Sequence, residues 1–259
     1  MKQKVTAKVL SQKEIAPGIY DMWLLTGLAK EAAAGQFIGV YPKDKSTLLP
    51  RPISICEVEK EEEKLRIVYR VAGKGTGEFS GYDAGEEVEV IGILGNGFPV
   101  EEAKGKKVVL MGGGIGIPPM VQLAKELQAS GVSVTAVLGY RDGKLFLKED
   151  LEKHATVFVA TEDGSEGVKG NVLTAMEEEK IQADMIMACG PMPMLRGIKK
   201  YGEEKGIKAY ISLEERMACG VGACLGCVCK TKKVDHHSHV NNARICTDGP
   251  VFDAEDVEI

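Results

Sequence analysis

Five of the seven cysteines in this 259-residue chain lie between residues 219 and 246. Four of them show the spacing Cys-x4-Cys-x2-Cys, followed after a longer interval by a last cysteine: Cys219, Cys224, Cys227 and Cys246. This spacing is close to the plant-type arrangement in which four thiolates hold a 2Fe–2S cluster. The pattern therefore predicts a one-electron redox centre in the last part of the sequence.

Three glycines, Gly220, Gly222 and Gly226, lie in the loop that carries the first three candidate ligands. They would let the loop wrap tightly at positive φ and turn backbone N–H groups toward the sulfurs. Zinc is the main alternative, although structural zinc sites usually use two short Cys-x2–4-Cys pairs separated by a longer gap. Free or disulfide-bonded cysteines are a third interpretation, and nothing in the sequence suggests export. Three ligands in one loop with the fourth alone favour iron–sulfur.

A fifth cysteine and three histidines lie close to the candidate ligands. We interpret Cys229 as a half-buried hydrophobic residue on the strand that leaves the loop, because its interval from Cys224 fits the ligand pattern poorly. A Rieske centre would use two histidines, but four cysteines already suffice here, so we expect a solvated hairpin at His236, His237 and His239.

The composition is that of a globular protein, with 44% hydrophobic residues, a net charge of -5 and a pI near 5.6. The acidic balance argues against nucleic acid or an anionic membrane as a partner, because both require a basic surface. No apolar run approaches the roughly 18 residues of a membrane span. The first residues lack the apolar stretch of a signal peptide, so we expect a cytoplasmic protein.

Residues 1–102 read as short strands rich in Val, Ile and Tyr, separated by glycine and proline. We expect strands at 4–10, 18–25, 36–41, 52–58, 64–71 and 86–93, which suggest a small antiparallel β-barrel. The charged run Glu57–Lys64 reads as a solvated hairpin tip.

Residues 103–211 alternate between strand and helix patterns, which predicts a Rossmann-like parallel α/β domain. The first turn contains Gly112, Gly113, Gly114 and Gly116 before a helix that begins at Pro118. Glycines there would let a pyrophosphate approach the backbone at a helix N-terminus, although Ile117 replaces the third glycine of the dinucleotide fingerprint. A turn that needs glycine for its geometry alone is the alternative. Residues 212–259 complete the chain as the cysteine module.

The barrel region contains three short motifs that could form a binding surface. In segment 51–54, Arg-Pro-Ile-Ser, the plain interpretation is an arginine at a strand start behind a proline. On the next expected strand, Val68 and Arg70 share one face and Tyr69 lies on the other. Segment 73–77 leads into a helix start, whose N–H groups would accommodate a phosphate.

Together these motifs resemble the flavin-binding barrel of the ferredoxin reductase superfamily. The resemblance implies FAD, with Arg51 on its pyrophosphate and Ser54 acting in catalysis near the flavin N5. It also implies FAD contacts from Pro52, Ile53, Val68, Tyr69, Arg70, Gly75 and Thr76. Many members have tyrosine where this chain has isoleucine, so aromatic stacking from that position is absent. A Cys-Gly-Pro turn at Cys189, Gly190 and Pro191 resembles the element that lies beside the nicotinamide of NAD.

The three regions, in this order, resemble those of the electron-transfer subunits of class 1B dihydroorotate dehydrogenases. The resemblance covers essentially the whole chain and is most specific in segments 51–54, 112–119, 217–224 and 246–252. The resemblance implies two such chains with two FMN-containing catalytic subunits, in which dihydroorotate is oxidised for pyrimidine (UMP) biosynthesis. Electrons would pass through the 2Fe–2S cluster and FAD to NAD. FAD must lie between the other two, because NAD carries two electrons as hydride and the cluster takes one.

Two other classes stay open. A ferredoxin reductase that uses NAD(P)H, or a flavoprotein subunit of a hydrogenase or sulfide reductase, would contain the same modules. A non-catalytic zinc-binding protein is the more distant alternative. The sequence does not distinguish NAD from NADP.

Overall fold

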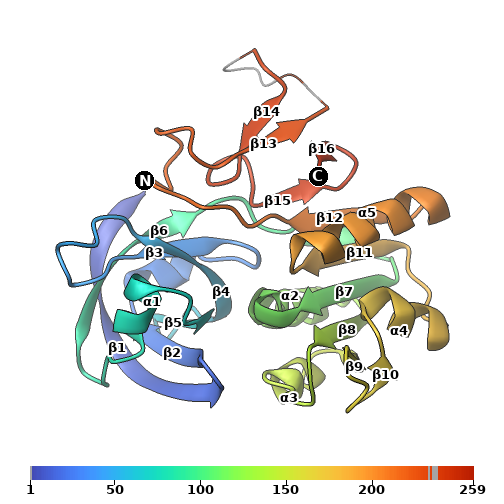
Figure 1. The fold of residues 1–259 in the computed structure, drawn as a ribbon, viewed down its shortest axis with the longest axis horizontal. Helices are drawn as coiled ribbons and strands as arrows, with labels where there is room; N and C mark the ends of the chain where they lie inside the picture. The colour runs from blue at the N-terminus through green and yellow to red at the C-terminus, as the bar shows by residue number, and fades with distance from the viewer. Residues whose placement is uncertain (1, 233, 235–238) are drawn as a thin grey trace.

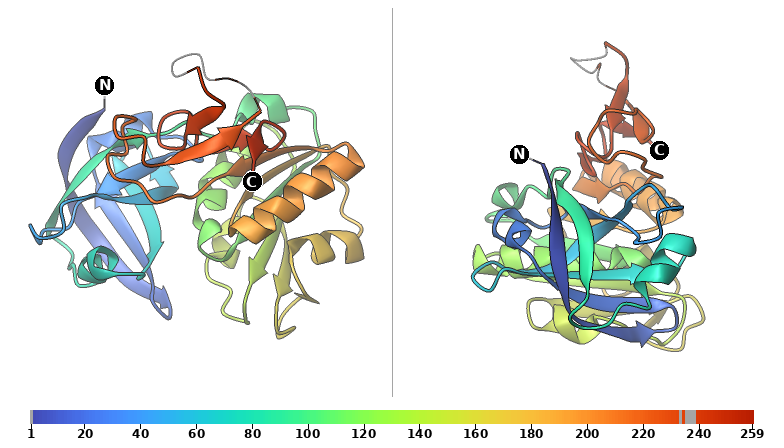
Figure 2. Two further views of the ribbon diagram at one scale, coloured as in Figure 1. Left: turned by 45° about the horizontal axis from the view of Figure 1, so that its top comes forward. Right: turned by 90° about the vertical axis from the view of Figure 1, so that its left-hand side faces the viewer.

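The computed structural model describes residues 2–232, 234 and 239–259. Three parts follow one another along the chain: a closed β-barrel, an α/β domain, and a small β-rich part that lies above the junction of the other two (Figure 1). Figure 2 shows from two further sides that this last part reaches over the barrel and the α/β domain. Within the described residues, no helix is both long and apolar enough to cross a membrane.

The barrel consists of six antiparallel strands in the order β1-β2-β5-β4-β3-β6. Along β6 every second residue from Val88 to Leu94 is buried, as expected where one face of a sheet meets a core. The strands are β1 Gln3–Ala16, β2 Ile19–Leu25, β3 Phe37–Val40, β4 Arg51–Glu59, β5 Lys64–Arg70 and β6 Glu87–Leu94. The predicted barrel is confirmed. Strand β1 is longer than predicted because it pairs first with β6 and then with β2.

Aliphatic and aromatic side chains fill the barrel. The short helix α1 (Lys74–Phe79) follows β5 and inserts the fully buried Phe79 into this core. The Phe79 ring meets the Tyr69 ring edge-on, with centroids 6.0 Å apart. This contact anchors the end of α1 to the barrel.

The α/β domain has a seven-stranded sheet in the order β10-β9-β8-β7-β11-β12-β15. Its strands are β7 Val108–Gly113, β8 Val134–Tyr140, β9 Thr156–Thr161, β10 Val168–Lys169, β11 Met185–Cys189, β12 Lys208–Ser212 and β15 Val251–Asp253. All pairings are parallel except that of β12 with β15. The predicted Rossmann-like domain is confirmed, and β15 adds an edge strand that comes from the cysteine region.

Helices cover both faces of this sheet. They are α2 Pro118–Ala129, α3 Lys148–Glu152, α4 Val172–Glu178 and α5 Met192–Lys205. Alternate residues of β7 enter two separate cores: Val108 and Leu110 pack with α2, while Val109 and Met111 pack with α4 and α5. Because α2 also contacts β4 of the barrel, the first core joins the two domains.

The cysteine region folds around a three-stranded sheet of β14 (Asn242–Arg244), β13 (Val228–Thr231) and β16 (Val257–Glu258). The buried Cys227, Ile245 and Cys246 share a hydrophobic core with Leu94 of the barrel and with α5. The region is therefore packed against both other parts.

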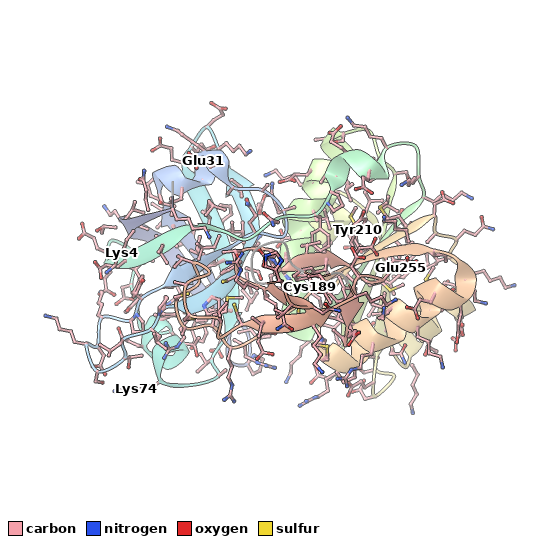
Figure 3. The ribbon with its side chains drawn as sticks, turned by 90° about the horizontal axis from the view of Figure 1, so that it is seen from above. Lys4, Glu31, Lys74, Cys189, Tyr210 and Glu255 are labelled. Atoms are coloured by element: carbon pink, nitrogen blue, oxygen red, sulfur yellow. The ribbon has the colours of Figure 1, made fainter. Side chains whose placement is uncertain are left out.

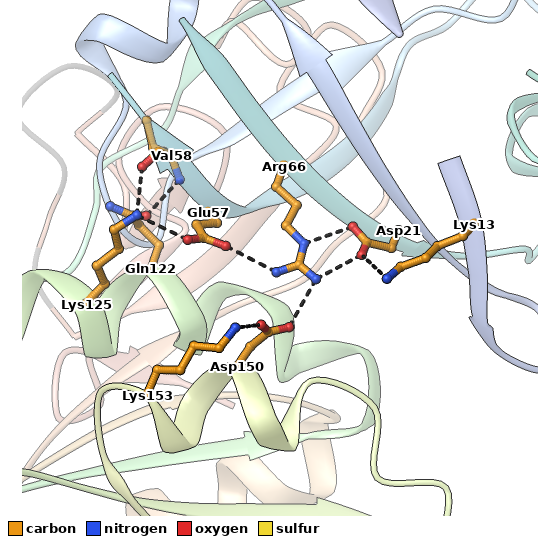
Figure 4. A network of polar contacts seen from close by, with 9 residues as sticks. All are labelled: Lys13, Asp21, Glu57, Val58, Arg66, Gln122, Lys125, Asp150 and Lys153. Carbon is orange, nitrogen blue, oxygen red and sulfur yellow. Dashed lines mark hydrogen bonds and ion pairs between the residues drawn. The ribbon is translucent and has the colours of Figure 1, made fainter. Parts of the chain in front are cut away.

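A buried ion-pair network also joins the barrel to the α/β domain (Figure 4). Arg66 of β5 donates to both carboxylate oxygens of Asp21, at 2.9 Å from Nε and 2.8 Å from Nη2. Its Nη2 also reaches Oδ2 of Asp150 in α3, and its Nη1 reaches Oε2 of Glu57, both at 3.1 Å. Lys125 of α2 pairs with Glu57 at 3.1 Å. The network ties three barrel strands to two helices of the other domain.

This network corrects one expectation. The predicted hairpin tip at Glu57–Lys64 is confirmed for the turn at 60–63. It is wrong for Glu57, which lies on β4 with its side chain 18% exposed, because the charges of Arg66 and Lys125 hold it at the domain interface.

Candidate functional site

The four candidate ligand cysteines form two contacting pairs. Cys219 interacts with Cys224, and Cys246 interacts with Cys227. In the part of the chain that the structure describes, no three His, Cys, Asp or Glu side chains lie close enough together to hold one metal ion. Two pairs of thiols fit a 2Fe–2S cluster, in which two irons share four protein ligands.

Backbone N–H groups point at the sulfurs of this loop. The amides of Val221 and Gly226 donate to the sulfurs of Cys219 and Cys224, each at 3.4 Å. Burial raises the pKa of the Cys219 thiol, but the amide hydrogen bonds outweigh it and lower the pKa to about 6. The loop therefore stabilises a thiolate at Cys219, which is the form that binds metal.

The glycines of the loop behave mostly as predicted. Gly220 and Gly222 have φ of 67° and 83°, in the left-handed region that favours glycine. The expectation of positive φ at Gly226 is wrong, because Leu225 takes that conformation, with φ of 54°. A Cβ on Gly222 would lie 2.8 Å from Cγ2 of Thr247, so this glycine lets the loop approach the fourth ligand segment.

Burial differs sharply among the cysteines. Cys227 and Cys246 are buried, while Cys224 is exposed at the edge of the module. Burial, followed by the neighbouring Cys227, raises the pKa of Cys246 to about 11. Cys229 is half-buried on β13, as predicted, and burial raises its pKa to about 11 as well.

The histidine prediction is tested in part. His236 and His237 lie outside the described residues, and His239 is exposed.

The residues expected to bind the flavin lie where β4 and β5 separate from each other, in a gap that we call the seam. In the described barrel, the pairing of these strands ends at Ile55 and Ile67. Beyond that point residues 51–54 of β4 pair with β3, and residues 68–70 of β5 pair with β2. The main chains of both segments therefore face the seam, where an elongated ligand could lie between them.

Arg51 lies against the start of α1. A Cβ on Gly75 would be 2.7 Å from the Arg51 Nε, so glycine makes room for the guanidinium. Thr76 accepts hydrogen bonds from the backbone of Ala72 and Gly73 through Oγ1, at 2.9 and 3.2 Å, and so stabilises this helix start. Arg51 thus meets Gly75 and Thr76, which follow it much later in the sequence, at one end of the seam. A guanidinium beside backbone N–H groups suits a diphosphate.

The three residues expected at the other side of the seam face different ways. Val68 is buried toward α2, and Arg70 is exposed. The side chain of Tyr69 is buried in the barrel, where its hydroxyl contacts Oε1 of Gln12 at 2.7 Å. Tyr69 therefore faces the seam with its main chain and not with its side chain.

A lateral register connects the seam with the cysteine loop. Ser54 on β4 pairs with Phe37 on β3, which pairs with Leu94 on β6. A Cβ on Gly220 would lie 3.3 Å from Cδ1 of Leu94. Neighbouring strands are about 4.8 Å apart, so the main chains of Ser54 and Leu94 are separated by about 10 Å. The expected flavin edge and the residue next to the cysteine loop therefore lie at the two ends of one row across three adjacent strands.

The glycine turn of the α/β domain follows β7 and leads into α2 through a single 3-10 turn at Gly114–Gly116. A Cβ on Gly112 would lie 3.0 Å from Ile117, and one on Gly113 would lie 2.5 Å from the sulfur of Met194. These two glycines are thus required by packing. Gly114 has φ of 52°, and no described atom lies within 4 Å of its Cβ position. The turn is therefore open at Gly114, where a ligand could approach.

The Cys-Gly-Pro turn packs directly on this glycine turn. A Cβ on Gly116 would lie 2.3 Å from the carbonyl oxygen of Cys189 and 2.6 Å from the nitrogen of Gly190. Seen from above, Cys189 lies at the boundary between the barrel and the α/β domain (Figure 3). Burial raises the pKa of Cys189 to about 12, so its thiol stays protonated at neutral pH. This agrees with a role beside a ligand rather than as a nucleophile.

Sequence reasoning missed one residue near these sites. Nothing in the local sequence indicates that Asn96 contacts the backbone that follows Cys246. Its amide donates to the carbonyl oxygens of Thr247 at 3.0 Å and Asp248 at 3.1 Å.

The barrel, the Rossmann-like sheet and the paired cysteines define an oxidoreductase of the ferredoxin reductase type with an added iron–sulfur module. Two family models match within the chain. The iron–sulfur cluster binding domain of dihydroorotate dehydrogenase B matches residues 214–258, and an oxidoreductase NAD-binding domain matches residues 110–200. The iron–sulfur match favours a cluster over the zinc alternative.

Similar proteins extend the match to the whole chain. The dihydroorotate dehydrogenase B (NAD(+)) electron transfer subunit of Streptococcus mutans serotype c is 43% identical over 256 residues, covering 98% of this chain and 96% of that protein. The protein of the same name from Bacillus velezensis is 40% identical, covering 99% and 100%. The chain therefore belongs to the family of dihydroorotate dehydrogenase B (NAD(+)) electron transfer subunits. A solved structure of an NADH-dependent reduced ferredoxin-NADP oxidoreductase is 28% identical, with a TM-score of 0.85, over 100% of this chain and 91% of that one.

Proposed function

We propose that this chain is the electron-transfer subunit of a class 1B dihydroorotate dehydrogenase and carries electrons between a catalytic subunit and NAD. The observation that carries this proposal is the register Ser54–Phe37–Leu94, which sets the expected flavin edge about 10 Å from the barrel residue that touches the cysteine loop. Electron transfer slows steeply with distance, so a flavin site and a cluster site separated by three adjacent strands are close enough to exchange electrons.

FAD, when bound, exchanges hydride with NAD and single electrons with a 2Fe–2S cluster. We propose that Arg51 pairs with the FAD pyrophosphate, together with backbone N–H groups at Gly75 and Thr76. Ser54 would donate a hydrogen bond from its hydroxyl group near the flavin N5. The remaining seam residues, Pro52, Ile53, Val68, Tyr69 and Arg70, line the rest of the flavin nucleotide, Tyr69 through its main chain.

We assign NAD to the α/β domain. The turn formed by Gly112, Gly113, Gly114 and Gly116 would hold the pyrophosphate at the start of α2, where helix N–H groups favour an anion. Cys189, Gly190 and Pro191 then border the nicotinamide. Since Gly116 packs on Cys189, one rigid surface would position both ends of the dinucleotide.

We assign the cluster to Cys219, Cys224, Cys227 and Cys246. The division into residues 1–102, 103–211 and 212–259 follows these three assignments, and the family models at 110–200 and 214–258 support it. Reduced thiols suit a cytoplasmic location.

The partner would be an FMN-containing catalytic subunit that oxidises dihydroorotate to orotate, with two copies of each chain. The relatives' printed name, electron transfer subunit, supports a partner of this kind. Oxidation of one dihydroorotate would release two electrons and two protons; a cluster held by the four cysteines would accept the electrons singly, and NAD would take up both electrons with one proton as hydride.

A second candidate function is that of a ferredoxin reductase that uses NAD(P)H. It is supported by the similarity to the NADH-dependent reduced ferredoxin-NADP oxidoreductase.

One experiment distinguishes the two candidate functions. Anaerobically purified protein, mixed with an FMN-containing dihydroorotate-oxidising subunit, should produce NADH from dihydroorotate and NAD. Rapid NADH-driven reduction of ferredoxin, with no NADH formed from dihydroorotate, would favour the second candidate instead.

A further inference from the structure

The loop that follows β6 binds the backbone just after the fourth candidate ligand. The Asn96 side chain donates to the carbonyl oxygens of Thr247 and Asp248, at 3.0 and 3.1 Å. The Asn96 backbone N–H donates to the Gly249 carbonyl oxygen at 2.6 Å. A single barrel residue therefore makes three hydrogen bonds to consecutive residues that begin one position after Cys246.

The neighbouring glycine brings the two backbones together. A Cβ on Gly95 would lie 2.5 Å from Cδ of Pro250 and 2.9 Å from the Gly249 carbonyl oxygen. Asn96 and Pro250 also form a parallel bridge. This close approach places the barrel loop flat against the ligand segment.

The ligand segment is held in shape from its other side. Arg244 donates from Nε and Nη2 to the two carboxylate oxygens of Asp248, each at 3.1 Å, and its backbone N–H reaches Oδ2 at 2.7 Å. Residues 244–248 thus form a closed loop around Cys246. Because this loop is internally braced, its contact with Asn96 fixes the position of Cys246 relative to the barrel.

We propose that Asn96 is a positioning residue for electron transfer, which holds the Cys246 side of the cluster at a fixed distance from the flavin. The inference rests on the proposed electron path. Asn96 lies two residues after Leu94, which ends the row that begins at Ser54. The chain that forms the last member of this row therefore also holds the ligand segment. The side chain acts through the backbone of Thr247 and Asp248 and touches neither redox group.

The test compares wild type with Asn96→Ala and Asn96→Asp. A carboxylate has the shape of the amide but cannot donate to the two carbonyls. Both variants keep the bond from the Asn96 backbone to Gly249, so the segment stays attached. Asn171→Ala is the matched control, since Asn171 also makes two hydrogen bonds to backbone, at the start of α4 and away from the path.

Four measurements are needed: hydrogen exchange, rapid-mixing kinetics, the electron paramagnetic resonance spectrum of the cluster and its midpoint potential. Hydrogen exchange in residues 244–250 should accelerate roughly fourfold to a hundredfold in both Asn96 variants, since each of the two lost bonds contributes a factor of roughly two to ten. After mixing with NADH, the rate of flavin reduction should not change, but cluster reduction should slow roughly tenfold. A displacement of about 1 Å between reacting groups can slow a reaction by this much or more. The electron paramagnetic resonance spectrum and midpoint potential of the cluster should not change, and Asn171→Ala should match wild type in every respect.

Cluster reduction at the wild-type rate in both Asn96 variants would overturn the inference, and so would slowing accompanied by a shifted cluster potential. Failure of the proposed electron path is distinguishable, because NADH would then not reduce the cluster in wild type either. Accelerated exchange with an unchanged rate of cluster reduction would show a structural contact without a positioning role.

Discussion

Ser54 and Leu94 occupy one lateral row of the barrel, joined through Phe37, and Leu94 contacts the glycine loop that carries Cys219. This row relates the expected flavin edge to the cysteine loop without any flexible linker between them. The distance between the two sites is therefore set by strand pairing, which is one of the most rigid features of a protein.

The four cysteines assigned to the cluster are tested one at a time. Changing Cys219, Cys224, Cys227 or Cys246 to serine should remove the electron paramagnetic resonance signal of the reduced cluster, because each pair of thiols would lose a member. Cys229→Ser is the control and should keep the signal, since Cys229 lies on β13 outside both pairs. A signal lost in Cys229→Ser but kept in Cys227→Ser would show that the ligand set is wrong.

The arginine at the seam should govern flavin retention. Arg51→Ala removes a charge-assisted contact worth about 1.5 to 3 kcal/mol, so the FAD affinity should fall roughly tenfold to a hundredfold. FAD content after extensive dialysis measures this change. Arg196→Ala, at an exposed position of α5, should retain FAD as wild type does. Equal FAD content in the two variants would remove Arg51 from the site.

The open glycine of the nucleotide turn should govern NADH use. Gly114→Val fills the space next to the turn and should raise the KM for NADH sharply, while FAD and cluster stay bound. Valine at positive φ is also strained. Gly131→Val controls for strain, because Gly131 has φ of 78° and open space but lies at the end of α2 far from the turn. NADH kinetics equally impaired in both variants would point to strain alone.

The ion-pair network between the domains should make stability depend on pH. Burial raises the pKa of Asp150, but the Lys153 hydrogen bond and the Arg66 charge outweigh it, and the pKa in the folded protein lies below its usual value. The pKa of an aspartate in the unfolded chain is about 3.9. A lower pKa in the folded protein stabilises the fold at pH values above about 3.9, and this stabilisation is lost as the pH falls through the pKa of the folded protein.

Asp150→Asn should therefore lower the free energy of unfolding at pH 7 by roughly 1 to 3 kcal/mol. The difference from wild type should shrink as the pH drops below about 4. Urea unfolding at both pH values measures it. Asp142→Asn is the control, because its ion pair with Lys144 is exposed and worth about 0 to 1 kcal/mol. A difference between Asp150→Asn and wild type that persists unchanged in acid would exclude the charge as the cause.

Much of the fold could be predicted because its pattern is local. The strands of the barrel and of the α/β domain have the two-residue period or the short buried runs that identify them, and α2 and α5 are long enough to be recognised. Helix α3, with five residues, is too short to be recognised from its sequence pattern. Strand β15 was missed because its three residues carry little pattern and its partner β12 lies about 40 residues earlier in the chain.

The site was predictable where a motif carries its own chemistry, as in the cysteine spacing. It was not predictable where side chains act across the chain. Glu57 sits in a charged run that looks solvated, and the sequence gives no sign of the Arg66 network that buries it. Asn96 sits in a glycine-rich turn, and its partners lie more than 150 residues away. Contacts of this kind depend on tertiary packing rather than on local pattern.

Rapid mixing of NADH with protein stripped of FAD, with its cluster intact, tests the central claim most directly. Hydride cannot enter a one-electron centre, so the cluster absorbance should stay oxidised in the stripped protein and should bleach once FAD is restored. In the complete protein, flavin bleaching should precede or accompany cluster reduction. Reduction of the cluster by NADH without FAD would contradict the electron path and the role assigned to the barrel.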